Sequence, residues 1–370
     1  MGSKTKTKPS IFKIIRNILL ILLSILILFF VVLFIVHKML SVQEYNQLDE
    51  AGYVNSVSAG EYNLNVSKYG NENGNHTLVA MSGMGVQDYS VMLRNVTDSL
   101  ADDNEIVFVD RAGYGLSDDT DIEQTTQRIV EDYRTALKNA GCEGPYVLLP
   151  HSLGGVYATY WESMYPEEIE GVVFIDTTEL QEGVIFDDIE KSGLWNRIEI
   201  FGCNVGMQRL LYDNYILPPS VNASEEQATL SKSLYIRSMT SNAALSENDL
   251  INDNCKTAYD NIVTNDIPKV YISASSFTET EQFSEYAEYV NERLIRGGSE
   301  AIFDTSGEEF VTLAEKTIEA VEERNETILF PYFEKLGNCD YKAVPGDHYI
   351  YEQKPEECLQ IISEFLDTLD

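Results

Sequence analysis

Basic residues are scarce in this sequence, and most of its length holds very few of them. The chain has 26 Lys and Arg residues against 60 Asp and Glu residues. No acidic residue precedes Lys38, and positions 39–370 carry 20 basic and 60 acidic side chains, a net charge of −40. Such a surface repels polyanions, so nucleic acid is not expected as a partner. The simplest interpretation is a solvated, self-repelling surface that keeps the domain soluble.

Cysteine and histidine are too few and too scattered to suggest a metal site. The five cysteines form no Cys-x-x-Cys pair and no grouping with histidine of the kind that binds zinc. We therefore expect neither a metal nor another cofactor. A disulfide is permitted outside a membrane, and Cys203 with Cys255 or Cys339 with Cys358 are the candidate pairs. The odd number of cysteines leaves at least one thiol unpaired.

The N-terminus contains the one long apolar run. Ile18 to Val36 is interrupted only by Ser24, and its 19 residues are enough to cross about 30 Å of hydrocarbon. A cleaved signal peptide would instead have an apolar region of about 7–15 residues before a small-residue cleavage site. Here the run is followed by "HKML", although "SVSAG" near Ala59 is a weak small-residue site. We expect an uncleaved transmembrane helix over 18–38.

The charges around this run predict its orientation. Only Lys38 follows closely, whereas five basic residues precede the run: Lys4, Lys6, Lys8, Lys13 and Arg16. By the positive-inside bias, residues 1–17 form a cytoplasmic segment. The chain is then a single-pass protein of the cell membrane, with a juxtamembrane linker over 39–59 and an extracytoplasmic domain over 60–370.

Apolar runs that alternate with helical patterns indicate an α/β fold with a mostly parallel sheet covered by helices on both faces. One helix is predicted over 124–141, closed by Gly141. A second begins after residue 153, and its apolar spacing predicts that it is largely buried. The predicted strands are "TLVAMSG" (77–83), "EIVFVD" (105–110), "YVLLP" (146–150), "GVVFID" (171–176) and "KVYISAS" (269–275).

Ser152 stands at a sharp corner, "PHSLGG", between a predicted strand and a predicted helix. A serine on such a turn has its Oγ exposed above the sheet, and the backbone N–H that follows it points to where an oxyanion would form. Gly154 and Gly155 would let the helix approach the strand closely. The alternative is an ordinary turn in which the serine caps the helix.

From this corner outward, residues 60–370 resemble the α/β-hydrolase superfamily. "SGMG" (82–85) resembles the family's oxyanion loop, "DRAGYGLSD" (110–118) the loop after its fourth strand, and "PGDHYIYEQKPEECLQIISEFL" (345–366) its histidine loop and last helix. The family usually has glycine two positions before the nucleophile, where this chain has Pro150. At the last residue of a strand the lost backbone donor is tolerable.

The resemblance assigns the general base to His348, in "GDH" before the terminal helix. Only three other histidines exist. His37 abuts the apolar run, His76 precedes the oxyanion strand, and the turn is expected to aim the side chain of His151 away from the site. The oxyanion donors implied by the family are the backbone N–H groups of Met84 and Leu153.

The triad acid must lie between Ser152 and His348 if the family's order holds. Most relatives carry it after the strand matching 269–275, but only Glu279 and Glu281 follow there. Asp176 occupies the alternative position known within the superfamily, and its structural alternative is a carboxylate that caps the next segment. We favour Asp176 and leave the two glutamates open. Asp110 precedes the nucleophile and is interpreted as a structural partner of its loop.

Two further segments complete the expected domain. Residues 178–265 occupy the family's place for a cap, and its apolar residues within 194–217 are expected to pack or to face the pocket. The long acidic stretch 277–338 is expected to be helical decoration. The resemblance implies a serine hydrolase acting on a small-molecule ester, with an amide or peptide hydrolase similar to proline iminopeptidases second. A catalytically silent binding domain with the same fold is the remaining alternative.

Overall fold

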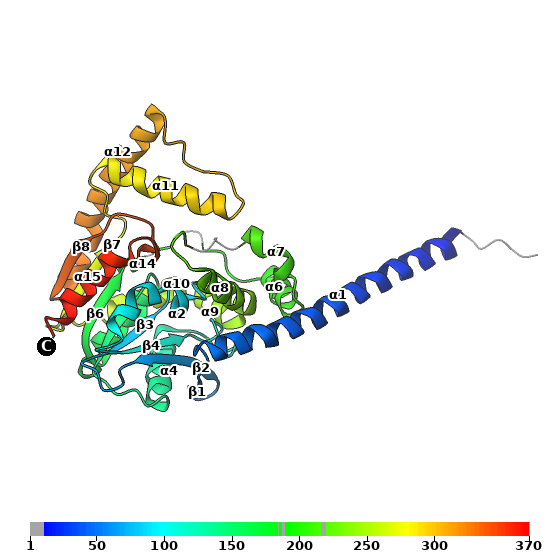
Figure 1. Ribbon diagram of the computed structural model, residues 1–370, viewed down its shortest axis with the longest axis horizontal. Helices are drawn as coiled ribbons and strands as arrows, with labels where there is room; N and C mark the ends of the chain where they lie inside the picture. Colours follow the sequence, from blue (N-terminus) through cyan, green and yellow to red (C-terminus); the bar gives the residue numbers. More distant parts are fainter. Residues whose placement is uncertain (1–10, 184, 187–188, 216–219, 370) are drawn as a thin grey trace, which may run out of the picture.

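A single eight-stranded sheet runs through the domain in the order β1-β2-β4-β3-β5-β6-β7-β8 (Figure 1). The computed structural model describes residues 11–369 except 184, 187–188 and 216–219, so Lys4, Lys6 and Lys8 of the predicted cytoplasmic segment lie outside it. Strands β3 to β8 are parallel, and β1 and β2 are antiparallel additions at one edge. The strands are β1 (Ser56–Ser58), β2 (Asn63–Gly70), β3 (Thr77–Met81), β4 (Glu105–Asp110), β5 (Tyr146–Pro150), β6 (Ile169–Ile175), β7 (Lys269–Ser273) and β8 (Cys339–Ala343).

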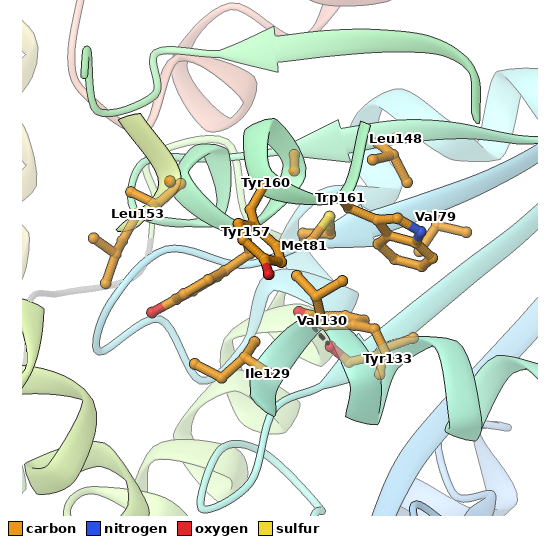
Figure 2. Close-up of a cluster of buried hydrophobic side chains, with 14 of the residues drawn as sticks. Val79, Met81, Ile129, Val130, Tyr133, Leu148, Leu153, Tyr157, Tyr160 and Trp161 are labelled. Atoms are coloured by element: carbon orange, nitrogen blue, oxygen red, sulfur yellow. Dashed lines mark hydrogen bonds between the residues drawn. The ribbon is translucent and has the colours of Figure 1, made fainter. Parts of the chain in front are cut away.

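Helices cover both faces of this sheet, as predicted. Because successive side chains of a strand point to opposite faces, β3 sends Val79 and Met81 into one apolar core and Leu78 and Ala80 into the other. The first core lies under α4 (Thr126–Asn139) and α5 (Gly154–Met164), where Trp161 is fully buried (Figure 2). The second lies under α2 (Tyr89–Met92), α3 (Arg94–Thr97), α14 (Ile350–Gln353) and α15 (Pro355–Leu366).

Two helical insertions separate neighbouring strands along the chain. The predicted cap between β6 and β7 contains α6 (Leu194–Asn204), α7 (Gln208–Tyr215), α8 (Glu225–Ser238), α9 (Asn242–Asp249) and α10 (Ile251–Asp260). The acidic stretch between β7 and β8 is helical, as expected, with α11 (Thr280–Arg296), α12 (Glu308–Arg324) and α13 (Phe330–Leu336). Helices α11 and α12 pack around a small apolar cluster of their own that includes Phe283 and Phe310.

Helix α1 (Ile11–Glu50) contains the predicted span but extends well beyond it. It is the one helix in the described part of the chain that is long and apolar enough to cross a membrane. Residues 39–59, expected to be a linker, instead continue this helix and then form β1. Leu48 is 1% exposed and Tyr53 is 5% exposed, because both pack into the second core. The folded domain therefore begins within α1 and before residue 60.

All five cysteines are unpaired, so neither predicted disulfide is present. For one pair the sheet itself explains this result. Cys339 packs against the first core and Cys358 is buried in the second, so the sheet separates them. In the other pair, Cys255 is buried in the first core, whereas Cys203 lies on the poorly buried helix α6.

Candidate active site

Ser152 lies at the tip of the turn from β5 into α5, with a left-handed φ of +52°. The two glycines after it permit close packing, as predicted. A Cβ on Gly154 would lie 2.4 Å from the carbonyl oxygen of Met81, and one on Gly155 would lie 2.4 Å from the Cβ of Thr177. Any larger residue would therefore push α5 away from the sheet. The backbone here therefore forms a strained strand-to-helix turn of the kind that exposes a serine Oγ above a sheet.

Asp176 and His348 are brought together from the ends of two distant segments. Nδ1 of His348 lies 2.7 Å from Oδ2 of Asp176. The other carboxylate oxygen accepts a hydrogen bond of 2.8 Å from the backbone N–H of Ala274. Asp176 directly follows β6, has a φ of +42° and is only 6% exposed. The carboxylate is thus fixed on the side facing the imidazole, which orients His348.

The environment of this pair stabilises its charged form. Burial acts to raise the pKa of Asp176, but the hydrogen bond and charge of His348 outweigh it and lower the pKa below its usual value. Burial acts to lower the pKa of His348, but the hydrogen bond and charge of Asp176 raise it above its usual value. An imidazolium formed at this position is therefore stabilised by Asp176.

Ser152 and His348 both line a cavity of about 410 Å³. Within the part of the chain that the structure describes, no hydrogen bond joins Oγ of Ser152 to His348. Such contacts commonly tighten only when substrate binds. The other walls combine apolar and polar groups from both insertions and from the loops after β3, β6 and β7, among them Val86, Phe186, Ile251, Thr178, Glu179, Ser275 and Arg324.

Met84 and Leu153, whose backbone N–H groups are the predicted oxyanion donors, line the same cavity as Ser152. Among the described residues, neither backbone N–H of this pair donates to an acceptor. Unpaired donors next to a nucleophile can bind the negative charge that develops on a carbonyl oxygen.

The remaining acidic candidates lie elsewhere. Glu279 and Glu281 are exposed at the start of α11, and neither lines the cavity. Asp110 accepts hydrogen bonds from the N–H of Leu116 and the amide of Asn65, as its structural interpretation predicted. Burial raises the pKa of Asp110 to about 6.

His151 does not point away from the site, contrary to expectation. Its ring is fully buried and its centroid lies 4.6 Å from that of His348. Burial lowers the pKa of His151 to about 3, so the ring is neutral at ordinary pH. Nε2 of His151 lies 3.0 Å from the carbonyl oxygen of His348 and donates to it. The residue next to Ser152 therefore holds the backbone of His348 in place.

Sequence reasoning missed a buried ion pair beside residues 82–85, the predicted oxyanion loop. Nε of Arg111 lies 3.0 Å from Oε1 of Glu247, and these side chains are 2% and 1% exposed. The guanidinium also donates to the backbone carbonyls of Ser82 and Gly83 in the oxyanion loop. Because Glu247 belongs to α9, this pair ties the cap to that loop. Arg111 stood within the quoted "DRAGYG" motif, but nothing in the sequence pointed to a carboxylate more than a hundred residues away.

Glu247→Gln is expected to destabilise the protein by about 3–5 kcal/mol, because it leaves the guanidinium of Arg111 buried without a counter-charge. Urea unfolding followed by tryptophan fluorescence measures the change. Asp260→Asn, which removes an exposed partner of Lys256, serves as the control and should cost less than about 1 kcal/mol. Equal effects of the two changes would contradict the importance of the buried pair.

Part of the chain is similar in sequence to known proteins. Residues 74–181 match the family described as serine aminopeptidase, S33. The chain is 28% identical to the uncharacterised protein YbdG of Bacillus subtilis over 226 residues, which are 59% of this chain and 67% of YbdG.

Solved structures agree on the fold at low sequence identity. Cfl2 from Burkholderia cenocepacia superposes with a TM-score of 0.53 at 17% identity, over 84% of this chain and 94% of its own. The enol-lactonase from Burkholderia xenovorans superposes with a TM-score of 0.52 at 13% identity, over 85% of this chain and 100% of its own. At these low identities, the structural similarity shows the fold alone.

Proposed function

We propose that this chain, which belongs to the α/β-hydrolase superfamily, is a membrane-anchored serine hydrolase that cleaves carboxylic esters. The observation that carries the proposal is the hydrogen bond between His348 and Asp176 in the lining of the cavity that Ser152 also lines. A nucleophile, a base and a group that orients the base are the parts that acyl transfer needs.

In the proposed reaction, Oγ of Ser152 attacks the ester carbonyl carbon while His348 takes the hydroxyl proton. The N–H groups of Met84 and Leu153 stabilise the oxyanion, and Asp176 stabilises the imidazolium. His348 then protonates the departing alcohol, which leaves an acyl group on Ser152. Water deprotonated by His348 attacks this acyl-enzyme, releases the acid and restores the serine.

The acidic residues of the cavity favour an ester over a peptide with a free N-terminus. Asp176 and Glu179 are the acidic side chains among the described residues that line it. Asp176 is bound to His348, and Glu179 forms an ion pair with Arg324. Neither carboxylate is therefore free to bind a substrate ammonium group. An amide or peptide hydrolase remains the second candidate because residues 74–181 match a serine aminopeptidase family.

A series of p-nitrophenyl esters of rising acyl length, run beside proline p-nitroanilide, tests the proposal on the full chain in detergent. We expect turnover of at least one ester to exceed that of the anilide, with inhibition by a fluorophosphonate. Turnover of the anilide alone would transfer the function to the peptidase alternative. Full activity after fluorophosphonate treatment would contradict a serine hydrolase of either kind.

The same proposal places the domain outside the cell membrane, held by residues 18–38 of α1. Its support is the apolar composition of the helix and the excess of basic residues before it. Protease added to intact spheroplasts should then remove a C-terminal epitope tag. A tag that survives until the membrane is permeabilised would reverse the orientation, and a soluble protein beginning near Ala59 would indicate cleavage.

A further inference from the structure

Helix α6 has no buried residue anywhere along its length. Its apolar side chains were expected to pack or to face the catalytic pocket, and the structure shows that several do neither. Trp195 is 81% exposed and Phe201 is 63% exposed. The other exposed apolar residues of α6 and α7 are Leu194, Ile198, Leu210 and Leu211. Residues 194–215, here called the α6–α7 hairpin, therefore present an apolar surface that the domain itself does not cover.

This hairpin is attached to α1 at the outer end of the apolar run. Figure 1 shows α6 and α7 beside α1, on the side of the domain from which α1 projects. Arg209 of α7 donates to Nδ1 of His37 at 2.9 Å and to both carboxylate oxygens of Glu44, at 2.6 and 2.7 Å. A Cβ on Gly206, between the two helices, would lie 2.6 Å from the Cβ of His37. The hairpin is therefore held at a defined position along α1.

That position coincides with the edge of the predicted span. Within residues 18–38, the buried side chains are Leu33 and His37, which are 9% and 6% exposed. Leu33 precedes Val36, the last residue of the apolar run, by three positions, or about 5 Å along a helix. Amphipathic helices bind membranes with their apolar face about 5–10 Å into the boundary between headgroups and acyl chains. The domain therefore covers α1 as far as Leu33, which is about as deep in the membrane as amphipathic helices insert.

We propose that the α6–α7 hairpin is a second membrane contact, which inserts its apolar side chains into the outer leaflet beside α1. The inference rests on the membrane span of the proposed function and extends it from the anchor to the cap. When α1 spans a bilayer, the same bilayer covers the apolar surface of the hairpin, because the hairpin is fixed at the end of the span. Another copy of this chain is disfavoured because positions 39–370 of each copy carry a net charge of −40. The acidic domain also implies that the contact is apolar and does not depend on anionic lipid.

The two tryptophans of the chain provide a direct measurement. Trp161 is fully buried in the core under α5, whereas Trp195 lies on the exposed face of α6. The full chain is placed, one copy per disc, in phosphatidylcholine nanodiscs with or without bromine on the upper acyl chain. The emission of Trp195 is the difference between the wild type and Trp195→Phe. We expect brominated lipid to reduce this emission about twofold or more, because an indole at interfacial depth contacts the bromine.

Quenching by lipid bromine and by aqueous iodide, measured in the same discs, shows whether Trp195 lies in lipid, in water or against protein. Quenching of Trp195 by bromine, with protection from aqueous iodide and no dependence on added anionic lipid, supports the proposal. Quenching by iodide and not by bromine would overturn it, and so would protection from both, which would mean that Trp195 packs against the protein itself. Fluorophosphonate labelling of the same sample reports on the catalytic proposal separately. A labelled protein whose Trp195 stays in water would contradict the membrane contact while leaving the hydrolase intact.

Discussion

Ser152→Ala is expected to lower ester turnover by about six orders of magnitude, because it removes the attacking oxygen from a unit in which loss of one member costs nearly as much as loss of all. The fold should be retained, since Ser152 stands on a turn and its hydroxyl makes no hydrogen bond within the described residues. Steady-state turnover of a p-nitrophenyl ester gives the rate, and circular dichroism checks the fold. A residual rate remains from the oxyanion donors and substrate binding.

Ser275→Ala is the matched control because this serine lines the same cavity. Its contact with the triad is through the backbone, where its N–H lies 3.4 Å from Oδ1 of Asp176. We expect the variant to keep most of the wild-type rate. If Ser275→Ala lost activity as completely as Ser152→Ala, or if Ser152→Ala stayed active, the nucleophile would have to be reassigned.

Asp176→Asn is expected to lower turnover by about four orders of magnitude, because an amide no longer holds the tautomer of His348 that can accept the serine proton. A second readout is the pH profile. Activity requires neutral His348, and Asp176 raises the pKa of this histidine, so the wild-type rate should fall as pH drops through a value above about 6.5. In Asp176→Asn burial remains while the charge is gone, so the residual activity should persist to lower pH.

Glu279→Gln and Glu281→Gln are the controls for this prediction. Both glutamates are exposed at the start of α11 and away from the cavity, so each change should leave the rate and its pH profile nearly unaltered. A severe loss confined to either variant would transfer the orienting role to that glutamate. An Asp176→Asn variant with an unshifted profile would show that this carboxylate does not act through His348.

The parts of the fold that followed from sequence are those with strong local patterns. Buried parallel strands such as β4 and β7 are continuous apolar runs, and both lie where they were predicted. Two other strands lack that signal. Strand β2, between β1 and β4, has asparagine at two positions and the polar pair Ser67 and Lys68, and the edge strand β8 is a short segment with two charged residues, so neither was identified.

The site divides in the same way between local and long-range features. Ser152 and His348 lie in local motifs, and Asp176 at the end of a buried strand, which is why they could be named from sequence. Glu247 could not, because its role depends on a contact with Arg111 that only the folded cap creates. The exposure of Trp195 could not be predicted either, since an amphipathic helix has the same spacing whether it faces a core, a pocket or a membrane.

The identity of the residue that becomes acylated is the central claim, and one experiment measures it directly. The full-length protein is treated with a fluorophosphonate in detergent, digested, and mapped by tandem mass spectrometry. A single adduct of one phosphonyl group on Ser152, absent from Ser152→Ala and slowed in Asp176→Asn, is the predicted result. An adduct on a different residue, or a protein that remains unmodified while it still hydrolyses ester, would contradict the account.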